Sequence, residues 1–142
     1  MRKFQSLFVV VALLLAGCTS DPYRAAIKGS SDVSQAVSSA IKITASYYSA
    51  GTFNDAQKAT AAAVFTVVTD CNMTFRKAVV GVHNAGQTSV AAFLPIADAF
   101  VVCTQRAPQV QNDVKLKAAL QAVDSAIQGV RLAISSAKGT KP

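Results

Sequence analysis

Four stretches of this 142-residue chain carry apolar residues at alternating spacings of three and four, the pattern of a helix with one buried face. The clearest stretch lies toward the C-terminus, and its apolar positions are Leu116, Leu120, Val123, Ile127, Val130 and Ile134. No segment alternates apolar and polar residues between hairpin turns, as a half-buried strand would. The pattern therefore predicts an all-α fold.

The other three stretches are bounded by residues that start and stop helices, and they predict helices over residues 32–50, 54–84 and 88–106. Their expected apolar faces are Val33, Val37, Ala40, Thr44 and Tyr47; then Val64, Val67, Cys71, Phe75, Ala78 and Val82; then Phe93, Ile96, Phe100 and Cys103. Pro95 lies inside the third stretch, which predicts either a kink there or a helix that begins at Pro95.

Helices of about 19 to 30 residues joined by short loops pack as antiparallel neighbours. We therefore expect an antiparallel four-helix bundle over residues 32–138, followed by a short tail at residues 139–142. Hydrophobic residues make up 51% of the chain, which excludes an intrinsically disordered protein because so apolar a chain can bury a core.

The N-terminus has the layout of a secretory signal. Arg2 and Lys3 precede an apolar run over residues 7–16, which is too short to span a bilayer, since a spanning helix needs about 20 residues. The run ends in Leu15, Ala16, Gly17 and Cys18, and this segment resembles the lipobox of bacterial lipoproteins. The resemblance implies removal of residues 1–17 and acylation of Cys18. The alternative is an ordinary cleaved signal with a coincidental cysteine.

The residues after the lipobox bear on location. In Gram-negative lipoproteins, Asp directly after the acylated cysteine favours the inner membrane, whereas here the first Asp is Asp21. The resemblance thus implies an outer-membrane anchor with the domain in the periplasm; the alternative is the outer face of the cytoplasmic membrane. We expect residues 18–31 to form the acylated cysteine and a flexible tether, with at most a short helix over residues 24–28. Such a tether could extend at most about 45 Å.

Two further cysteines lie on the apolar faces of consecutive helices. Cys71 lies 16 residues before Gln87, the centre of the expected turn, and Cys103 lies 16 residues after it, so the two should face each other across a helical hairpin. In exported proteins, cysteine pairs so placed tend to be oxidised to disulfides. We expect an interhelical disulfide; the alternatives are buried free thiols, or a metal or redox site.

The sequence offers little for catalysis. His83 is the single histidine, and we expect it to interact with the C-terminal end of its helix. The seven Asp residues are scattered, with Asp32 and Asp55 expected to open helices, and no phosphate-binding loop or Gly-X-Ser-X-Gly motif is present. We therefore expect neither an enzyme nor a cofactor or metal site.

The formal net charge is +7, and removal of Arg2 and Lys3 would leave +5. This excess is either a solvated helix surface or a source of attraction to anionic lipid headgroups, peptidoglycan or an acidic partner, whereas nucleic acid is not expected outside the cytoplasm. Tyr47 is expected in the core. Tyr48 and Phe53, which follow it, could together form an exposed apolar patch. The candidate binding surface comprises Tyr48, Phe53, Arg76, Lys77, Lys115 and Lys117.

Lipobox, tether, helical bundle and cysteine pair together loosely resemble the pilotins, lipoproteins that escort secretins to the outer membrane. The resemblance is one of architecture, without a shared motif. It implies a lipoprotein that binds or scaffolds another envelope protein, as exclusion lipoproteins also do. The alternative is a structural envelope lipoprotein held on peptidoglycan or anionic lipid; in the cell-wall-linked lipoprotein of enterobacteria the chain ends in a cross-linked Lys, whereas this chain ends in Pro142.

Overall fold

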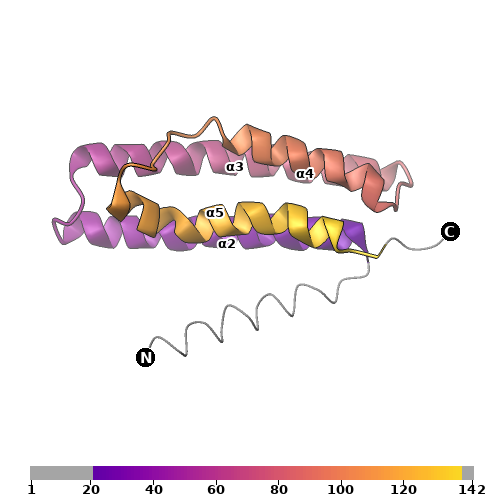
Figure 1. Ribbon diagram of the computed structural model, residues 1–142, viewed down its shortest axis with the longest axis horizontal. Helices are drawn as coiled ribbons and strands as arrows, with labels where there is room; N and C mark the ends of the chain where they lie inside the picture. Colours follow the sequence, from indigo (N-terminus) through magenta and orange to yellow (C-terminus); the bar gives the residue numbers. More distant parts are fainter. Residues whose placement is uncertain (1–20, 139–142) are drawn as a thin grey trace, which may run out of the picture.

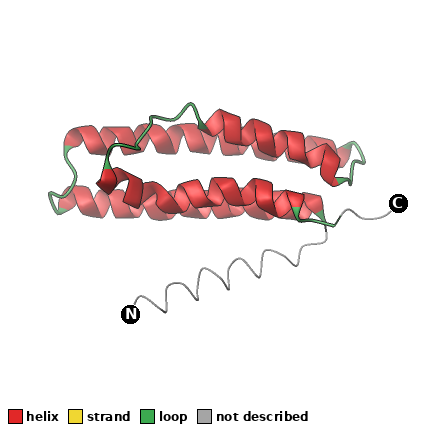
Figure 2. Cartoon of the chain, in the orientation of Figure 1, coloured by secondary structure: helices red, strands yellow, loops and turns green. Residues whose placement is uncertain are grey.

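The computed structural model describes residues 21–138, and this part of the chain forms four helices and no strand (Figure 1, Figure 2). The helices are α2 (Pro22–Ser49), α3 (Asp55–Asn84), α4 (Val90–Thr104) and α5 (Val114–Ser135). The all-α helical bundle is therefore confirmed.

The helices run up and down in chain order. Each packs against the next, and α5 returns to pack along α2 over the most extensive of the helix contacts, while the diagonal pairs touch least. The described chain enters and leaves at the same end of the bundle, which is also the end of the α3–α4 turn (Figure 1). The α2–α3 turn and the start of α5 lie at the opposite end.

Local capping explains where the helices begin and end. Asp21, Asn54, Ser89 and Asp113 each accept a hydrogen bond from a backbone N–H of the first turn, which satisfies a donor that the helix itself leaves free. Gly51 and Gly86 follow α2 and α3 with φ of 73° and 80°, a conformation in which glycine avoids the strain of a side chain. The two predicted glycine stops are thus confirmed.

The N-terminal boundary of the bundle was predicted ten residues too late. Residues 22–31 belong to α2, which begins at Pro22 instead of Ser31 or Asp32, so the tether prediction is wrong for this segment. Asp32 lies inside the helix and accepts a hydrogen bond from Lys28 at 2.7 Å instead of capping. Gly29, within the expected tether, allows α2 and α5 to pack closely, because a Cβ on it would lie 3.1 Å from Cγ2 of Val130 in α5.

The buried faces largely follow the predicted spacing. All six apolar positions of α5 are buried, as predicted. On α3 the buried face is rotated slightly, so that Val68 and Val79 are buried whereas Ala78 is exposed. Tyr47 was expected in the core but is 40% exposed, and its ring packs edge-on against Phe53, which occupies the core instead.

The third helix begins before its proline. Ser89 caps α4 and the helix continues through Pro95, so a start at Pro95 is excluded. Pro95 lies in the second turn of α4 and lacks the N–H that would bond to the Ala91 carbonyl, so the helix forgoes this hydrogen bond.

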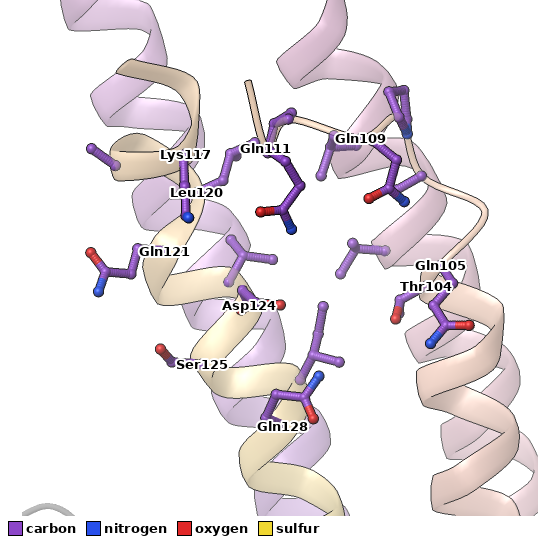
Figure 3. A pocket seen from close by; sticks show the side chains of 18 of the residues that line it. Thr104, Gln105, Gln109, Gln111, Lys117, Leu120, Gln121, Asp124, Ser125 and Gln128 are labelled. Atoms are coloured by element: carbon purple, nitrogen blue, oxygen red, sulfur yellow. The ribbon is translucent and has the colours of Figure 1, made fainter. Parts of the chain in front are cut away.

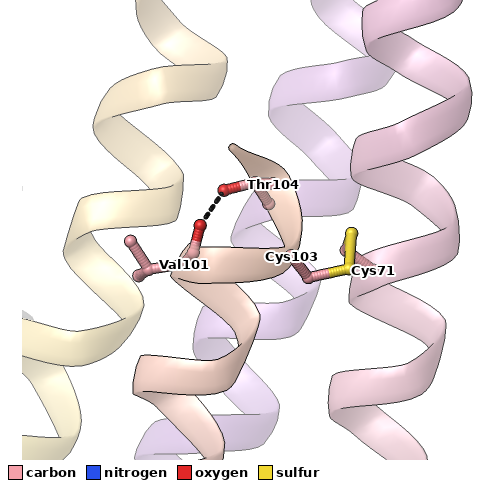
Figure 4. The surroundings of a disulfide bond; sticks show 4 residues. All are labelled: Cys71, Val101, Cys103 and Thr104. Atoms are coloured by element: carbon pink, nitrogen blue, oxygen red, sulfur yellow. Dashed lines mark hydrogen bonds between the residues drawn. A yellow bond between two sulfur atoms is a disulfide. The ribbon is translucent and has the colours of Figure 1, made fainter. Parts of the chain in front are cut away.

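The predicted disulfide is present. Cys71 of α3 and Cys103 of α4 are joined, with their Cα atoms 5.8 Å apart (Figure 4). In the last turn of α4, the Thr104 hydroxyl donates to the Val101 carbonyl at 2.7 Å. The disulfide therefore fastens the C-terminal end of α4 to the middle of α3.

The helices differ greatly in length. At about 1.5 Å per residue, the 30 residues of α3 span about 45 Å and the 15 residues of α4 only about 22 Å. We call the half of the bundle that contains α4 the closed half. The other half, in which residues 105–113 take the place of a fourth helix, is the open half (Figure 1).

Within residues 21–138, no helix combines the length and apolarity that a membrane-spanning segment needs. The lipobox and Cys18 lie outside the described residues, as does the tail at residues 139–142.

Candidate functional site: a cleft beside the shortened helix

A cleft of about 670 Å³ opens in the open half of the bundle (Figure 3). It exists because α4 ends at Thr104, after which the chain crosses to α5 through residues 105–113 without forming a helix. α3, the end of α4, this crossing segment and α5 all contribute to its walls. Its volume falls within the range of about 300–1,000 Å³ that is typical of ligand pockets.

The base of the cleft is apolar. The fully or nearly buried side chains that line it are Val64, Val68, Leu120, Val123 and Ile127. Two of them come from α3 and three from α5, on the faces that a full-length fourth helix would cover. The cleft thus reaches down to the buried core of the bundle beside the end of α4.

The rim of the cleft is polar and rich in side-chain amides. Gln109 and Gln111 extend from the crossing segment and Gln128 from α5, around one opening (Figure 3). The exposed polar residues that line the cleft are Gln105, Gln109, Gln111, Lys117, Gln121, Asp124, Ser125 and Gln128. Each glutamine offers two N–H donors and one carbonyl acceptor, so the rim can bond both to donors and to acceptors.

The crossing segment is anchored where it meets α5. The Asp113 carboxylate caps α5 by accepting from the Leu116 N–H at 3.0 Å, and it also accepts from the Gln57 side chain of α3 at 2.9 Å. These two hydrogen bonds, the Leu116 bond first, lower the pKa of the Asp113 carboxyl below its ordinary value. Gln57 in turn completes a capping box with Asn54. One chain of hydrogen bonds therefore joins the starts of α3 and α5.

The structure divides the predicted binding surface instead of bringing its residues together. Only Lys117 lines the cleft. Lys115 lies at the same end of the bundle as Lys117, and its ammonium is 3.4 Å from the Thr52 carbonyl in the α2–α3 turn. Arg76 and Lys77 lie in the C-terminal part of α3, in the closed half.

The expected aromatic patch is wrong in one of its two members. Phe53 is only 2% exposed and belongs to the core. Tyr48 is 36% exposed, but its hydroxyl donates to Asp55 at 2.7 Å and its ring lies 4.0 Å beneath the Lys58 ammonium. The hydrogen bond to Asp55 raises the pKa of Tyr48 above its ordinary value. Tyr48 thus stabilises the α2–α3 turn and does not form an apolar patch with Phe53.

His83 lies in the last turn of α3, as predicted, and its ring stacks on Tyr23 of α2 with 3.8 Å between the ring centroids. The Tyr23–His83 contact therefore fastens the first turn of α2 to α3.

Across residues 21–138, no group of three His, Cys, Asp or Glu side chains is placed to hold a metal ion.

A second hollow, of about 260 Å³, lies between α2 and α3 beside the exposed Met73. It is smaller than typical ligand pockets. The larger cleft is therefore the stronger candidate site.

Sequence reasoning missed most of the residues that line the cleft. Gln121, Asp124 and Gln128 recur with Lys117 at spacings of four, three and four, which places them on one stripe of α5. That spacing was visible in the sequence, but a polar helix stripe ordinarily faces solvent. This polar stripe lines a cleft only because α4 ends early and residues 105–113 lie opposite it.

No protein-family model, curated protein sequence or solved structure matches this chain.

Proposed function

We propose that this protein is a lipid-anchored envelope protein whose domain faces the periplasm and binds or scaffolds another envelope protein, in the manner of a pilotin or an exclusion lipoprotein. The cleft of the open half carries the proposal, because it offers an apolar base and a hydrogen-bonding rim where a complete four-helix bundle would be closed. The role is one of binding, without catalysis or a cofactor.

The proposed anchor would orient the bundle. Acylated Cys18 precedes Pro22, the first residue of α2, by only four positions, which span at most about 14 Å. The end of the bundle with the α3–α4 turn would then lie close to the lipid. α4 separates that turn from the cleft by about 22 Å, so the cleft would face the periplasm and be accessible to a protein there.

A second candidate role is that of a structural element on peptidoglycan or anionic lipid. Arg24, Arg76 and Lys77 are exposed and lie in the closed half, the end that the anchor would bring to the membrane. Cationic side chains so placed are attracted to anionic headgroups at about 1 kcal/mol each near the surface.

Site-directed photocrosslinking in the producing cells separates the two roles. A photoreactive phenylalanine derivative at position 128, on the rim of the cleft, is expected to capture one dominant protein. The same derivative at position 39, on the exposed face of α2 away from the cleft, should capture none. Capture of peptidoglycan alone at position 128 would refute the binding role and support the structural one.

The anchor is tested separately. Cys18→Ala should abolish incorporation of labelled fatty acid and release the domain from membranes, since a single acyl chain or none does not hold a protein stably. Unchanged membrane attachment of this variant would contradict the lipoprotein assignment.

A further inference from the structure

The cleft has two polar walls that face each other. One is on α5, where Lys117, Asp124 and Gln128 line the cleft, while the Gln121 side chain points away from it (Figure 3). The other is formed by glutamines of α4's C-cap and of the crossing segment, at positions 105, 109 and 111. Amides on these walls can donate to carbonyls and accept from N–H groups of a chain lying between them.

The apolar base suits a chain in extended conformation. Successive side chains of an extended peptide point in opposite directions, so every second one can enter the cleft while the backbone stays between the polar walls. Val64, Val123 and Ile127 would receive such a side chain. A helix offers no equivalent match, because its backbone groups are already paired and would leave the rim amides without partners.

Two opposite charges lie on the α5 wall. Lys117 and Asp124 are seven residues apart, which is about 10 Å along the helix. Both are exposed, and within residues 21–138 neither forms an ion pair. An extended peptide covers about 10 Å in three residues, so it could place an anionic group at Lys117 and a cationic group at Asp124.

We propose that the cleft binds a short extended segment of a partner protein, three to four residues long, with an apolar side chain on the valine and isoleucine base. Its carboxylate lies against Lys117 and its cationic group against Asp124, which sets the direction of the segment along α5. This inference rests on the proposed function, since it names the chemistry of the partner at the same cleft.

The test uses the full-length protein as cells produce it, in detergent micelles, titrated with the tetrapeptide Ala-Leu-Ala-Val. Its free carboxylate and free amine stand in for the anionic and cationic groups of the partner segment. Binding is followed by the NMR shifts of glutamine side-chain amides. The amides of Gln105 and Gln128 should shift on titration, whereas that of Gln35 on α2, which does not line the cleft, should not. Absence of shifts at Gln105 and Gln128 would overturn the proposal.

Capped peptides and charge variants test the two ends. Acetylating the amine or amidating the carboxylate should each weaken binding about two- to fivefold, as expected for exposed ion pairs. Lys117→Gln should remove the preference for a free carboxylate, and Asp124→Asn the preference for a free amine. Lys42→Gln and Asp70→Asn, exposed charges outside the cleft, are the matched controls and should change neither preference.

The outcomes separate this inference from the proposed function. If photocrosslinking at position 128 captures a protein but no peptide binds, or if capping has no effect, the extended-segment assignment fails alone. If the peptide binds with the expected preferences but photocrosslinking captures only peptidoglycan, the proposed function fails while the cleft chemistry stands. Binding of a peptidoglycan stem peptide in place of the linear tetrapeptide would refute a protein segment as the occupant.

Discussion

Three helices, α2, α3 and α5, run through both halves of the bundle, but the two halves differ in what covers the core. In the closed half, α4 lies over the core and buries Phe93, Ala97 and Phe100. In the open half, residues 105–113 lie over the core and leave room for the cleft. The boundary between the halves is the Cys71–Cys103 disulfide, which fastens α4 close to the point where it ends.

Because of this difference, we expect stability and the proposed binding to depend on separate halves of the bundle. A complete helix covers apolar side chains and pairs its own backbone N–H and C=O groups. An irregular segment leaves some apolar surface uncovered and some backbone groups to bond with solvent or a partner. The closed half should therefore dominate the free energy of unfolding, while the open half should tolerate substitution and carry recognition. Four substitution experiments test this contrast.

Removal of the disulfide should have the largest effect. Cys71→Ala combined with Cys103→Ala frees a loop with a sequence separation of 32 residues. In the chain-entropy model, the free energy of unfolding should then fall by about 3–4 kcal/mol. Urea unfolding of the double variant and the parent measures the difference, and a loss below about 1 kcal/mol would show that the boundary does not depend on the bond.

A matched pair of valines on α3 compares the two halves directly. Val79 is fully buried in the closed half, whereas Val64 is 7% exposed and lines the cleft. Val79→Ala should cost about 2 kcal/mol, because it removes buried methyl groups and leaves a cavity. Val64→Ala should cost about 1 kcal/mol or less, since part of its surroundings is already open. Equal losses in urea unfolding would contradict the contrast between the halves.

Two glycines test how closely α2 and α5 approach. Gly81→Ala should raise the free energy of unfolding by about 0.5–1 kcal/mol, because its new Cβ meets nothing within 4 Å and alanine favours helix. Gly29→Ala gains the same helix propensity, but its Cβ would lie 3.3 Å from the Val130 backbone. We expect a net loss of up to about 1 kcal/mol from overpacking at this contact. A stabilising Gly29→Ala in thermal unfolding would show that the two helices can move apart freely.

The smallest effect should appear at acid pH. The pKa of Asp113 is lowered in the folded protein, so its contribution to stability is complete above its ordinary value of 3.8 and is lost as the pH falls through the lowered value. Asp113→Asn keeps a capping side chain but removes this titration, and should flatten the decline in stability below pH 3.8. Asp70→Asn is the control, and urea unfolding from acid to mildly acid pH distinguishes the variants. An unchanged decline in Asp113→Asn would place the responsible carboxyl elsewhere.

Much of the fold could be predicted because it depends on local spacing. The six buried positions of α5 follow the helix period, and the cysteine pair follows from equal distances to a turn. Both features concern residues that any helical hairpin with these sequences would place in the same way.

The predictions that were wrong concern tertiary contacts, which local sequence patterns do not encode. Residues 29–31 resemble a turn in isolation, yet Gly29 remains helical because α5 packs against it at close range. Phe53 lies in a turn and was expected at the surface, but it is buried in the core, whereas Tyr47 was expected in the core and is 40% exposed. The cleft depends on the path of residues 105–113, and composition alone does not determine where such a segment runs.

The common exit of both chain ends has a practical consequence for labelling. The start of α2 and the end of α5 lie at the same end of the bundle (Figure 1), so a fluorescent protein fused after α5 would compete for space with the proposed lipid anchor. Gly51 is exposed and lies in the opposite turn, about 45 Å along α3, and a side chain added to it would meet no other atom within 4 Å of its Cβ. A small epitope inserted there would lie at the end of the bundle opposite the proposed lipid anchor.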